Sequence, residues 1–390
     1  MELKNNDGGL GLTPARMVVS PAFIAGVVAA YPFLPEALQN DLKGEEGTSD
    51  TFPDFVQSFR EEVTSLSSQL DFTITTDSLF ARHNFADKGS KLQEALQDRI
   101  YDKELTSFKS EVLPTMSRTR KAIFVGTSTA TASAWLTVIP NKDELRLQPE
   151  HFQAALCHRY HLDQPSICTN LRCSCKRGAI VDAKGAHFQQ FCAMEGLRSD
   201  THNAIAHTLA NIMRGAGCLV RTEQRVCPDN GRKSDCSTNQ NPLSPLPLHV
   251  DVKVTGVHPE TGALSDANAL KQGRAAEAGY KEKIQDYGNL PETNNIQLLP
   301  FSVENHGFIH QQSLKLVEVL AAKAELTWRL PSKVIFEYWL KLLSIALQRG
   351  IGIAIVSRAR TITSGIAASK SAAWRPVIPE EVRVYMHVDR

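Results

Sequence analysis

The sequence has almost no net charge and no cysteine outside one short window. It carries 43 basic and 42 acidic residues, a net charge of +1. No field of one sign therefore surrounds the whole molecule, and any nucleic-acid surface must be local. All eight cysteines lie between Cys157 and Cys236. A secreted disulfide scaffold would be shorter and denser in cysteine, whereas clustered Cys and His in a long chain favour metal binding in a reducing compartment. We therefore expect an intracellular protein, nuclear or cytoplasmic and not secreted.

Long hydrophobic runs are also scarce. The most apolar stretch, residues 17–34, is interrupted by Pro21 and Pro32 and has no basic segment directly before it. A signal peptide is therefore not predicted. The stretch is short for a membrane span, and a buried helix is the favoured interpretation. No membrane partner is expected.

One stretch combines cysteine and histidine at the spacing of metal ligands. It reads Cys173-x-Cys175, then eleven residues to His187 and four more to Cys192. Three thiols and one imidazole suit a closed tetrahedral structural Zn²⁺ site. A single residue between paired cysteines is tighter than usual, so Cys168 could replace one of the two. The alternative is a group of incidental free thiols.

A second stretch, residues 248–254, alternates apolar and polar residues and predicts a half-buried strand. His249, Asp251 and Lys253 share one face. The opposite face consists of Leu248, Val250, Val252 and Val254. We expect the valines to be buried against a helix carrying Ile205, Leu209 and Met213.

Acidic residues around this strand indicate chemistry. Asp235 lies sixteen residues before Asp251, and Lys253 follows two residues after it. An acid, a loop and then acid-x-Lys on a strand is the layout of a nuclease that cleaves phosphodiesters with a divalent metal. Two carboxylates supply hard oxygen ligands for Mg²⁺ or Mn²⁺, and a lysine positions the attacking water. The alternative is a polar strand face with a surface ion pair, because the pattern is short.

The flanking sequence predicts an α/β unit. A helix is expected over 199–213, followed by a strand over 218–226 that carries Glu223. After the 248–254 strand, a long helix over 265–287 carries Lys283. A last strand is expected over 295–303, and Pro300 makes it edge-like or bent. Helix, strand, acid loop, strand, helix and strand is the order of a restriction-endonuclease-like core, a mixed central sheet flanked by helices.

The chain is long enough for several domains. We expect a mixed, partly disordered lead over 1–75, a helical region over 76–162 and a zinc knuckle over 163–197. A restriction-like core over 198–310 follows, and then C-terminal helices over 311–349 with a loosely ordered tail from Gly350 to residue 390. Polar residues of the helix that begins near Glu150, among them His158 and Arg159, are expected to be solvated.

Together these residues resemble a known family. The Cys-Cys-His-Cys knuckle is followed by Arg198-x-x-x-His202, by Lys233-Ser234-Asp235, by Asp251-Val252-Lys253, and by Tyr280, Lys283 and Tyr287 on the next helix. This order is similar to the C-terminal region of non-LTR retrotransposon and related reverse-transcriptase proteins. There a zinc knuckle precedes a restriction-like endonuclease of the PD-(D/E)xK type.

The resemblance implies a Mg²⁺-dependent DNA endonuclease with a structural Zn²⁺. Asp235 and Asp251 would hold the metal, Glu223 would add a ligand, and Lys253 would position the water, with Lys283 as the alternative lysine. DNA is the expected partner, and RNA of a parent element is a further one. Ser234 departs from the family, which usually has proline there. No YADD-type polymerase motif is present, so the chain would be the endonuclease-bearing end of such an element, either a truncated copy or a separated gene.

Two other interpretations stay open. Loss of cleavage by drift would leave a catalytically inactive nucleic-acid-binding remnant with the same fold. A zinc-stabilised interaction module with no nucleic-acid role is the third possibility, and the nearly neutral charge favours it.

Overall fold

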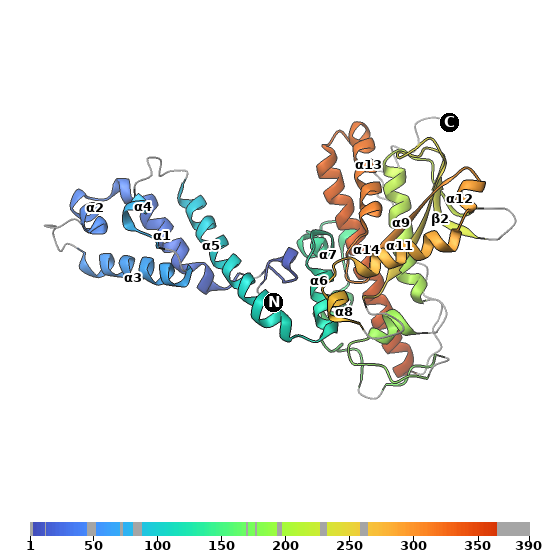
Figure 1. Ribbon diagram of the computed structural model, residues 1–390, viewed down its shortest axis with the longest axis horizontal. Helices are drawn as coiled ribbons and strands as arrows, with labels where there is room; N and C mark the ends of the chain where they lie inside the picture. The colour runs from blue at the N-terminus through green and yellow to red at the C-terminus, as the bar shows by residue number, and fades with distance from the viewer. Residues whose placement is uncertain are drawn as a thin grey trace. The chain divides into compact units, whose positions relative to one another are not determined.

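The computed structural model consists of two compact units, and each is described by itself (Figure 1). Unit 1 comprises Met1–Lys4 and Gly9–Met116, and unit 2 comprises Asn5–Gly8 and Ser117–Arg390. The structure describes residues 3–11, 13–44, 52–70, 73–80, 88–168, 171–175, 178–192, 197–226, 232–257 and 264–364.

Unit 1 is a helical bundle. Its helices are α1 (Val19–Ala30), α2 (Glu36–Lys43), α3 (Pro53–Leu70), α4 (Thr76–Phe80) and α5 (Lys88–Ser107). The apolar run at 17–34 forms a buried helix as predicted, because Ile24 and Val28 of α1 pack in one core with Phe59 of α3 and Ile100 of α5. Since α5 shares this core, residues 88–107 belong with the N-terminal segment. The division between units therefore falls after Met116 instead of at the predicted residue 75.

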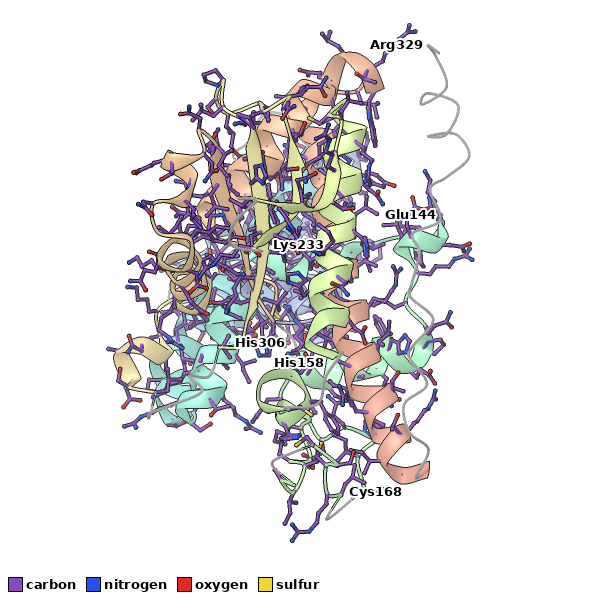
Figure 2. All side chains as sticks on the ribbon, turned by 90° about the vertical axis from the view of Figure 1, so that its right-hand side faces the viewer. Glu144, His158, Cys168, Lys233, His306 and Arg329 are labelled. Atoms are coloured by element: carbon purple, nitrogen blue, oxygen red, sulfur yellow. The ribbon has the colours of Figure 1, made fainter. Side chains whose placement is uncertain are left out.

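Three helices open unit 2: α6 (Arg118–Thr127), α7 (Ala130–Ser133) and α8 (Pro149–Arg159). The prediction that His158 and Arg159 are solvated is wrong, since both are buried. The Arg159 guanidinium donates to the carbonyl oxygens of Thr127 and Ala132, at 3.2 and 3.0 Å, and so fixes the turn between α6 and α7. His158 stacks on His306 with ring centroids 4.3 Å apart (Figure 2), which ties the end of α8 to the loop after the last strand.

A four-stranded mixed sheet forms the centre of unit 2, so the predicted α/β class is confirmed. Its strands β1 (Arg221–Arg225), β2 (Lys233–Thr238), β3 (Leu248–Thr255) and β4 (Gln297–Glu304) lie in the order β1-β2-β3-β4. The first two pairings are antiparallel and the third is parallel. β4 is the last strand in this order, so Pro300 lies in an edge strand, as the sequence indicates.

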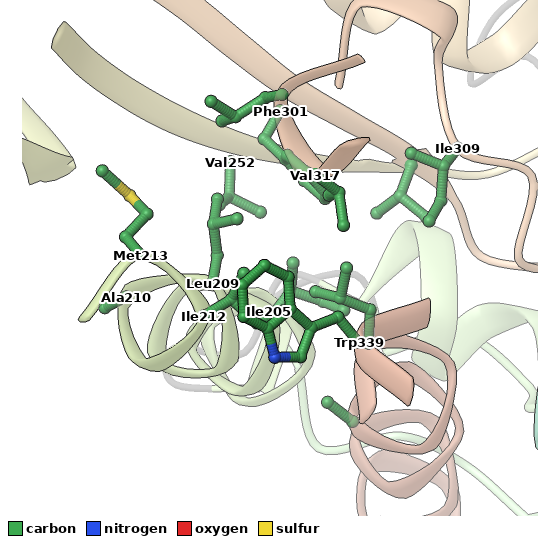
Figure 3. Close-up of a cluster of buried hydrophobic side chains, with 14 of the residues drawn as sticks. Ile205, Leu209, Ala210, Ile212, Met213, Val252, Phe301, Ile309, Val317 and Trp339 are labelled. Atoms are coloured by element: carbon green, nitrogen blue, oxygen red, sulfur yellow. The ribbon is translucent and has the colours of Figure 1, made fainter. Parts of the chain in front are cut away.

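The valine face of β3 packs as predicted. Val250 and Val252 are fully buried in one cluster with Leu209 and Met213 of α9 (Leu197–Gly215), whereas Val254 is only partly buried. Figure 3 shows Val252 beside Leu209. Trp339 and neighbouring residues from α13 (Gln311–Trp328) and α14 (Ser332–Ser364) complete the same core. The C-terminal helices therefore belong to the core of the sheet unit.

On the other face of the sheet α11 packs against β3 and β4, so most of β3 is buried on both sides instead of one. The predicted helix over 265–287 is divided into α10 (Asp266–Ala269) and α11 (Arg274–Tyr287), and the short α12 (Leu290–Thr293) follows. Ser265 caps α10 by accepting from the Asn268 N–H. The division occurs at Gly273, whose φ of +71° is left-handed and interrupts the helix.

The expected loose tail is wrong for residues 350–364, because α14 continues to Ser364. Gly350 and Gly352 lie where α14 crosses two neighbouring helices. A Cβ on Gly350 would lie 2.6 Å from Thr201 Cα of α9, and one on Gly352 would lie 2.8 Å from His151 Cα of α8. These glycines therefore serve close helix packing. Residues Ser332–Thr363 are long and apolar enough to cross a membrane, but 67% of the most apolar window is buried within the protein.

Candidate nuclease and metal sites

The two predicted acids meet where β2 and β3 separate. Pairing between these strands runs from Thr238↔Leu248 to Cys236↔Val250 and stops before Asp235 and Asp251. The Asp235 side chain enters this gap, where its Oδ2 accepts the Val252 N–H at 2.6 Å. The two carboxyl groups also act on one another, since Asp251 is among the groups that change the pKa of Asp235 and Asp235 is among those that change the pKa of Asp251. The end of the antiparallel pairing thus brings the two acids together.

Two side chains of α11 converge on Asp251. Lys283 Nζ lies 2.9 Å from its Oδ2, and the Tyr287 hydroxyl lies 2.7 Å from the same oxygen. The Tyr287 hydroxyl is also 3.0 Å from the Lys233 carbonyl oxygen, so its single hydrogen is shared between two acceptors. Lys283 and Tyr287 are four residues apart and therefore lie on one face of α11.

The N-terminal part of α9 supplies a hydrogen-bond partner for Asp235. His202 Nε2 lies 2.8 Å from Asp235 Oδ1. Burial alone would lower the pKa of His202, but its hydrogen bond to Asp235 and the charge of that carboxylate raise it above the usual value. The pair therefore favours an imidazolium facing a carboxylate.

The two acids are electrostatically unequal. Burial raises the pKa of Asp251 above its ordinary value, and the Lys283 and Tyr287 hydrogen bonds offset this only in part. Burial also acts to raise the pKa of Asp235, but His202 and the Val252 N–H outweigh it and hold that pKa below the usual range. Two adjacent carboxyl groups cannot both ionise easily without a cation. As the pH rises, Asp235 therefore loses its proton before Asp251 does.

The strand lysine does not take the predicted place. Lys253 Nζ donates to Glu282 at 2.6 Å, while Lys283, the alternative lysine, contacts Asp251. Glu223 is exposed, has a left-handed φ of +53° and lies 3.8 Å from Lys233, so it does not join the acid pair in the structure. Tyr280 stacks on His310 and contacts neither acid among the described interactions.

Two members of this arrangement had no assigned role in the sequence. His202 belongs to the Arg198-x-x-x-His202 pattern and Tyr287 to the long helix, and the resemblance gives neither residue a role. The Lys283/Tyr287 spacing on one helix face was the available signal for Tyr287. Nothing in the sequence places His202 beside Asp235. The side chain of Arg198, its partner in the motif, lies outside the described residues.

A separate cluster of Cys173, Cys175, His187 and Cys192 could bind a metal such as zinc. All four residues are buried, and their ligand atoms lie within 4.8 Å of one another. Cys173 Sγ is 3.6 Å from Cys192 Sγ, and Cys175 Sγ is 3.6 Å from His187 Nε2. Ligands about 2.3 Å (sulfur) and 2.0–2.1 Å (nitrogen) from a tetrahedral Zn²⁺ would be separated by roughly 3.5–3.8 Å, so these spacings fit the ion.

Local backbone contacts fix these ligands. The Cys173 N–H donates to the Ala179 carbonyl at 2.9 Å, which closes a turn around Cys175. Asp182 accepts the His187 N–H at 2.8 Å and thereby orients the short π-helical turn His187–Phe191. Cys168 is exposed and is not one of the four clustered ligands, so both members of Cys173-x-Cys175 take part.

The electrostatics of the cluster also fit a cation. Burial, together with the neighbouring Cys192 and Cys175 thiols, raises the pKa of Cys173 to about 12. Buried thiols therefore stay protonated until a positive ion replaces their protons. Figure 2 shows Cys168 and Lys233 in different parts of unit 2. Within the described residues the protein thus has a candidate soft-ligand site and, on other residues, a pair of carboxyl groups.

Known proteins supply no closer identification of these sites. No protein-family model matches the sequence, and no curated protein matches it significantly.

Proposed function

We propose that the protein is a divalent-metal-dependent endonuclease that hydrolyses phosphodiester bonds in DNA. The proposal depends above all on the meeting of Asp235 and Asp251 in the gap between β2 and β3, with Lys283 bound to Asp251. The order of elements supports it as well. A helix, three antiparallel strands, a crossover helix and a parallel strand is the order we expect of a restriction-endonuclease-like core.

The acid pair is chemically suited to Mg²⁺ or Mn²⁺. Both ions prefer carboxylate oxygens, and a dication bound between the two carboxylates would relieve their repulsion. Asp235 and Asp251 are the residues that would hold it. Bound there, the metal would act as a Lewis acid toward a phosphodiester oxygen and lower the pKa of water.

The surrounding side chains have separate tasks in this proposal. His202 keeps Asp235 ionised and fixes its orientation. Tyr287 holds Asp251 by its Oδ2. Lys283 supplies a positive charge that offsets the charge developing on the phosphate and orients the attacking water. We assign the catalytic lysine to Lys283, since Lys253 is engaged by Glu282.

The zinc cluster has a structural task in the proposed enzyme. Four protein ligands leave no open coordination position, which is typical of structural and not catalytic zinc. Bound zinc would brace residues 173–192 against the C-terminal half of α14, because Ala359 of α14 packs in the same cluster as the cysteines.

An inactive nucleic-acid-binding protein is the second candidate. One observation favours it: Asp235 is already satisfied by His202 and the Val252 N–H, and Asp251 by Lys283 and Tyr287. A network of this kind could persist for stability alone, since buried polar groups need partners.

Nicking of supercoiled plasmid DNA tests the proposal. We expect the purified protein to nick in Mg²⁺ or Mn²⁺ and Asp251→Asn to lose at least about 10²-fold in rate, because a metal ligand and an electrostatic partner are removed together. Asp286→Asn is the matched control, as Asp286 is an exposed acid of the same helix, α11. Equal rates for the two variants would contradict the site. No metal-dependent nicking by the unmodified protein would favour the inactive alternative.

A further inference from the structure

The outer hairpin of the sheet, formed by β1 and β2, carries an excess of positive charge. Its described residues include four exposed basic side chains and one exposed acid, Glu223. The basic residues are Arg221, Arg225, Arg232 and Lys233. The whole chain has a net charge of only +1, so this excess is local.

The register places like charges on one face of this hairpin. Arg225 is directly opposite Lys233, and like charges in such cross-strand pairs destabilise a hairpin. Arg221 lies on the same strand as Arg225. Between them Glu223 has a left-handed φ of +53°, and its Oε2 lies 3.8 Å from Lys233 Nζ, so a single acid offsets part of this positive charge. One strand of a duplex carries a phosphate about every 3.4 Å along the helix axis, so basic side chains spread along the hairpin can face several phosphates. The arrangement suits an extended polyanion better than a single small anion.

The same hairpin leads directly to the acid pair. Arg232 lies over the Tyr287 ring, 5.5 Å from its centroid, and Tyr287 in turn contacts Asp251. Lys233 begins β2, two residues before Asp235. A phosphate backbone lying along the hairpin would therefore pass beside the carboxyl pair.

We propose that Arg221, Arg225 and Lys233 form a phosphate-backbone site for duplex nucleic acid on this outer hairpin. The choice of nucleic acid rests on the proposed function, whereas the binding of a regular polyanion follows from the charges themselves. Contacts of this kind position a duplex without reading its sequence.

The salt dependence of binding tests the proposal in EDTA, where no cleavage occurs. Each phosphate contact contributes about 0.9 to the slope of log affinity against log salt for duplex DNA and about 0.7 for a single strand. Replacing Arg221, Arg225 and Lys233 together by Gln should lower the slope by about 2.7 on a duplex. A control triple variant replaces exposed basic residues of α13, α14 and their connection, Lys315, Arg329 and Lys333, and should keep the slope.

Several outcomes would overturn the hairpin site: an unchanged slope in the hairpin variant, an equal loss in the control, or polyglutamate competing as well as the duplex at equal charge. If the triple variant fails to fold by circular dichroism, Arg225→Gln alone should lower the slope by about 0.9. If the hairpin variant still nicks DNA and its salt-dependence slope is unchanged, the hairpin site is refuted but the proposed nuclease activity is not. If the unmodified protein binds duplex DNA through the hairpin but does not nick it, the proposed nuclease activity is refuted but the hairpin site is not.

A second, independent observation concerns a buried arginine beside the cysteine cluster. Arg358 of α14 is 3% exposed. Within the part of the chain that the structure describes, its Nε and Nη2 atoms have no hydrogen-bond partner. The next residue, Ala359, packs in the cluster formed by Cys173, Cys175 and Cys192. Burial lowers the pKa of Arg358, and its neighbours Cys192, Cys173, Asp200 and Cys175 act against that shift.

The charge of a loaded metal site explains this placement. Three thiolates, a neutral imidazole and Zn²⁺ sum to one negative charge in a buried environment. We infer that Arg358 neutralises this charge and donates N–H groups toward the cysteine sulfurs, acting as a positioning residue of the metal cluster. Outer hydrogen-bond partners of this kind typically change metal affinity by 10–100-fold.

Competition with a chelator tests the role of Arg358. Arg358→Met should weaken Zn²⁺ affinity about tenfold or more and shift the thiolate-to-metal charge-transfer band of the Co²⁺-loaded protein. Arg360→Met is the matched control, because Arg360 is exposed on the same helix and pairs with Glu150. It should change affinity less than twofold. Arg358→Lys should restore part of the affinity. Equal affinities and spectra for the Met variants at 358 and 360 would overturn the inference.

Discussion

Gly279 controls how closely α11 approaches the sheet, and replacing it by alanine should destabilise unit 2. A Cβ at this position would lie 2.5 Å from Thr255 Cγ2 and 3.0 Å from both Lys253 Cγ and Ser302 Oγ. Ordinary contact begins near 3.4 Å, so the helix or its neighbours must move by about 0.9 Å (3.4 minus 2.5). Ser302 cannot yield easily, because it is fully buried and its hydroxyl donates to the Ala276 carbonyl.

The expected magnitude follows from two opposing effects. Alanine in place of glycine inside a helix should stabilise by about 1 kcal/mol, whereas overpacking a well-filled core costs typically 1–3 kcal/mol or more. We expect the unfolding free energy of Gly279→Ala to fall by about 1–2 kcal/mol. The corresponding fall in Tm is roughly 2–8 °C for a unit of this size. Because Lys283 and Tyr287 are residues of α11, a shift of this helix would move them relative to Asp251, and the nicking rate should fall as well.

Thermal unfolding measured by calorimetry or circular dichroism checks this prediction. Gly26→Ala in α1 is the control, since nothing lies within 4 Å of the position of its Cβ. That change should stabilise unit 1 by about 0.5–1 kcal/mol. The reasoning would be refuted if Gly279→Ala were as stable as the unmodified protein, because α11 would then have room that the structure does not give it.

Three further predictions concern other parts of unit 2. Cys175→Ser should lose the bound metal and lower stability, whereas Cys168→Ser should retain about one Zn²⁺ per chain by mass spectrometry; loss of zinc from both would contradict the ligand set. The raised pKa of Asp251 means that its contribution to stability is present below pH 3.8 and is lost as pH rises through the folded-state pKa. The Tm of the unmodified protein relative to Asp251→Asn should therefore fall from pH 4 to neutrality in EDTA, and a rise would contradict the assigned direction. Glu304→Ala should cost about 1–3 kcal/mol in chemical denaturation because Glu304 accepts the Ala275 and Ala276 N–H groups at the start of α11; Glu304→Gln keeps an acceptor and should be nearly neutral, and equal losses would show that these hydrogen bonds contribute little.

The strand at the centre of the sheet could be predicted because its pattern has only one consistent interpretation. Alternation in β3 places Val250 and Val252 against α9, and the same alternation turns Asp251 to the other face. Pro300 lacks an N–H and is tolerated at the sheet edge, which its position in β4 confirms. The Cys/His spacing likewise led to the clustered ligands, because short arms limit how far those side chains can separate.

The choice between the two lysines could not be made from local sequence. It depends on where α11 begins and how it is rotated over the sheet, and these follow from the left-handed turn at Gly273 and the close approach at Gly279. Periodicity alone predicts one continuous helix from residue 265. It places Lys283 and Tyr287 on one face of that helix but does not give the distance between the helix and β3.

Glycine was misleading for a related reason. Gly350 and Gly352 look like loop residues in a sequence, whereas in the structure they allow α14 to cross its neighbours closely. Arg159 was misleading in the opposite sense, because a charged residue on a helix is usually solvated. Here the guanidinium is buried because it donates hydrogen bonds to the backbone carbonyl oxygens of Thr127 and Ala132. Both errors concern tertiary contacts that no local pattern encodes.

The central claim is that phosphodiester cleavage occurs at Asp235 and Asp251 with Lys283 as the catalytic amine. The most direct test is the rate of plasmid nicking in Mn²⁺ by the unmodified protein, Lys283→Met and Lys253→Met. We predict metal-dependent nicking whose rate falls at least about 10²-fold in Lys283→Met and less than about tenfold in Lys253→Met. The reason is that, of the two lysines, Lys283 contacts Asp251 whereas Lys253 contacts Glu282. Absence of nicking by the unmodified protein, or a greater loss in Lys253→Met, would contradict it.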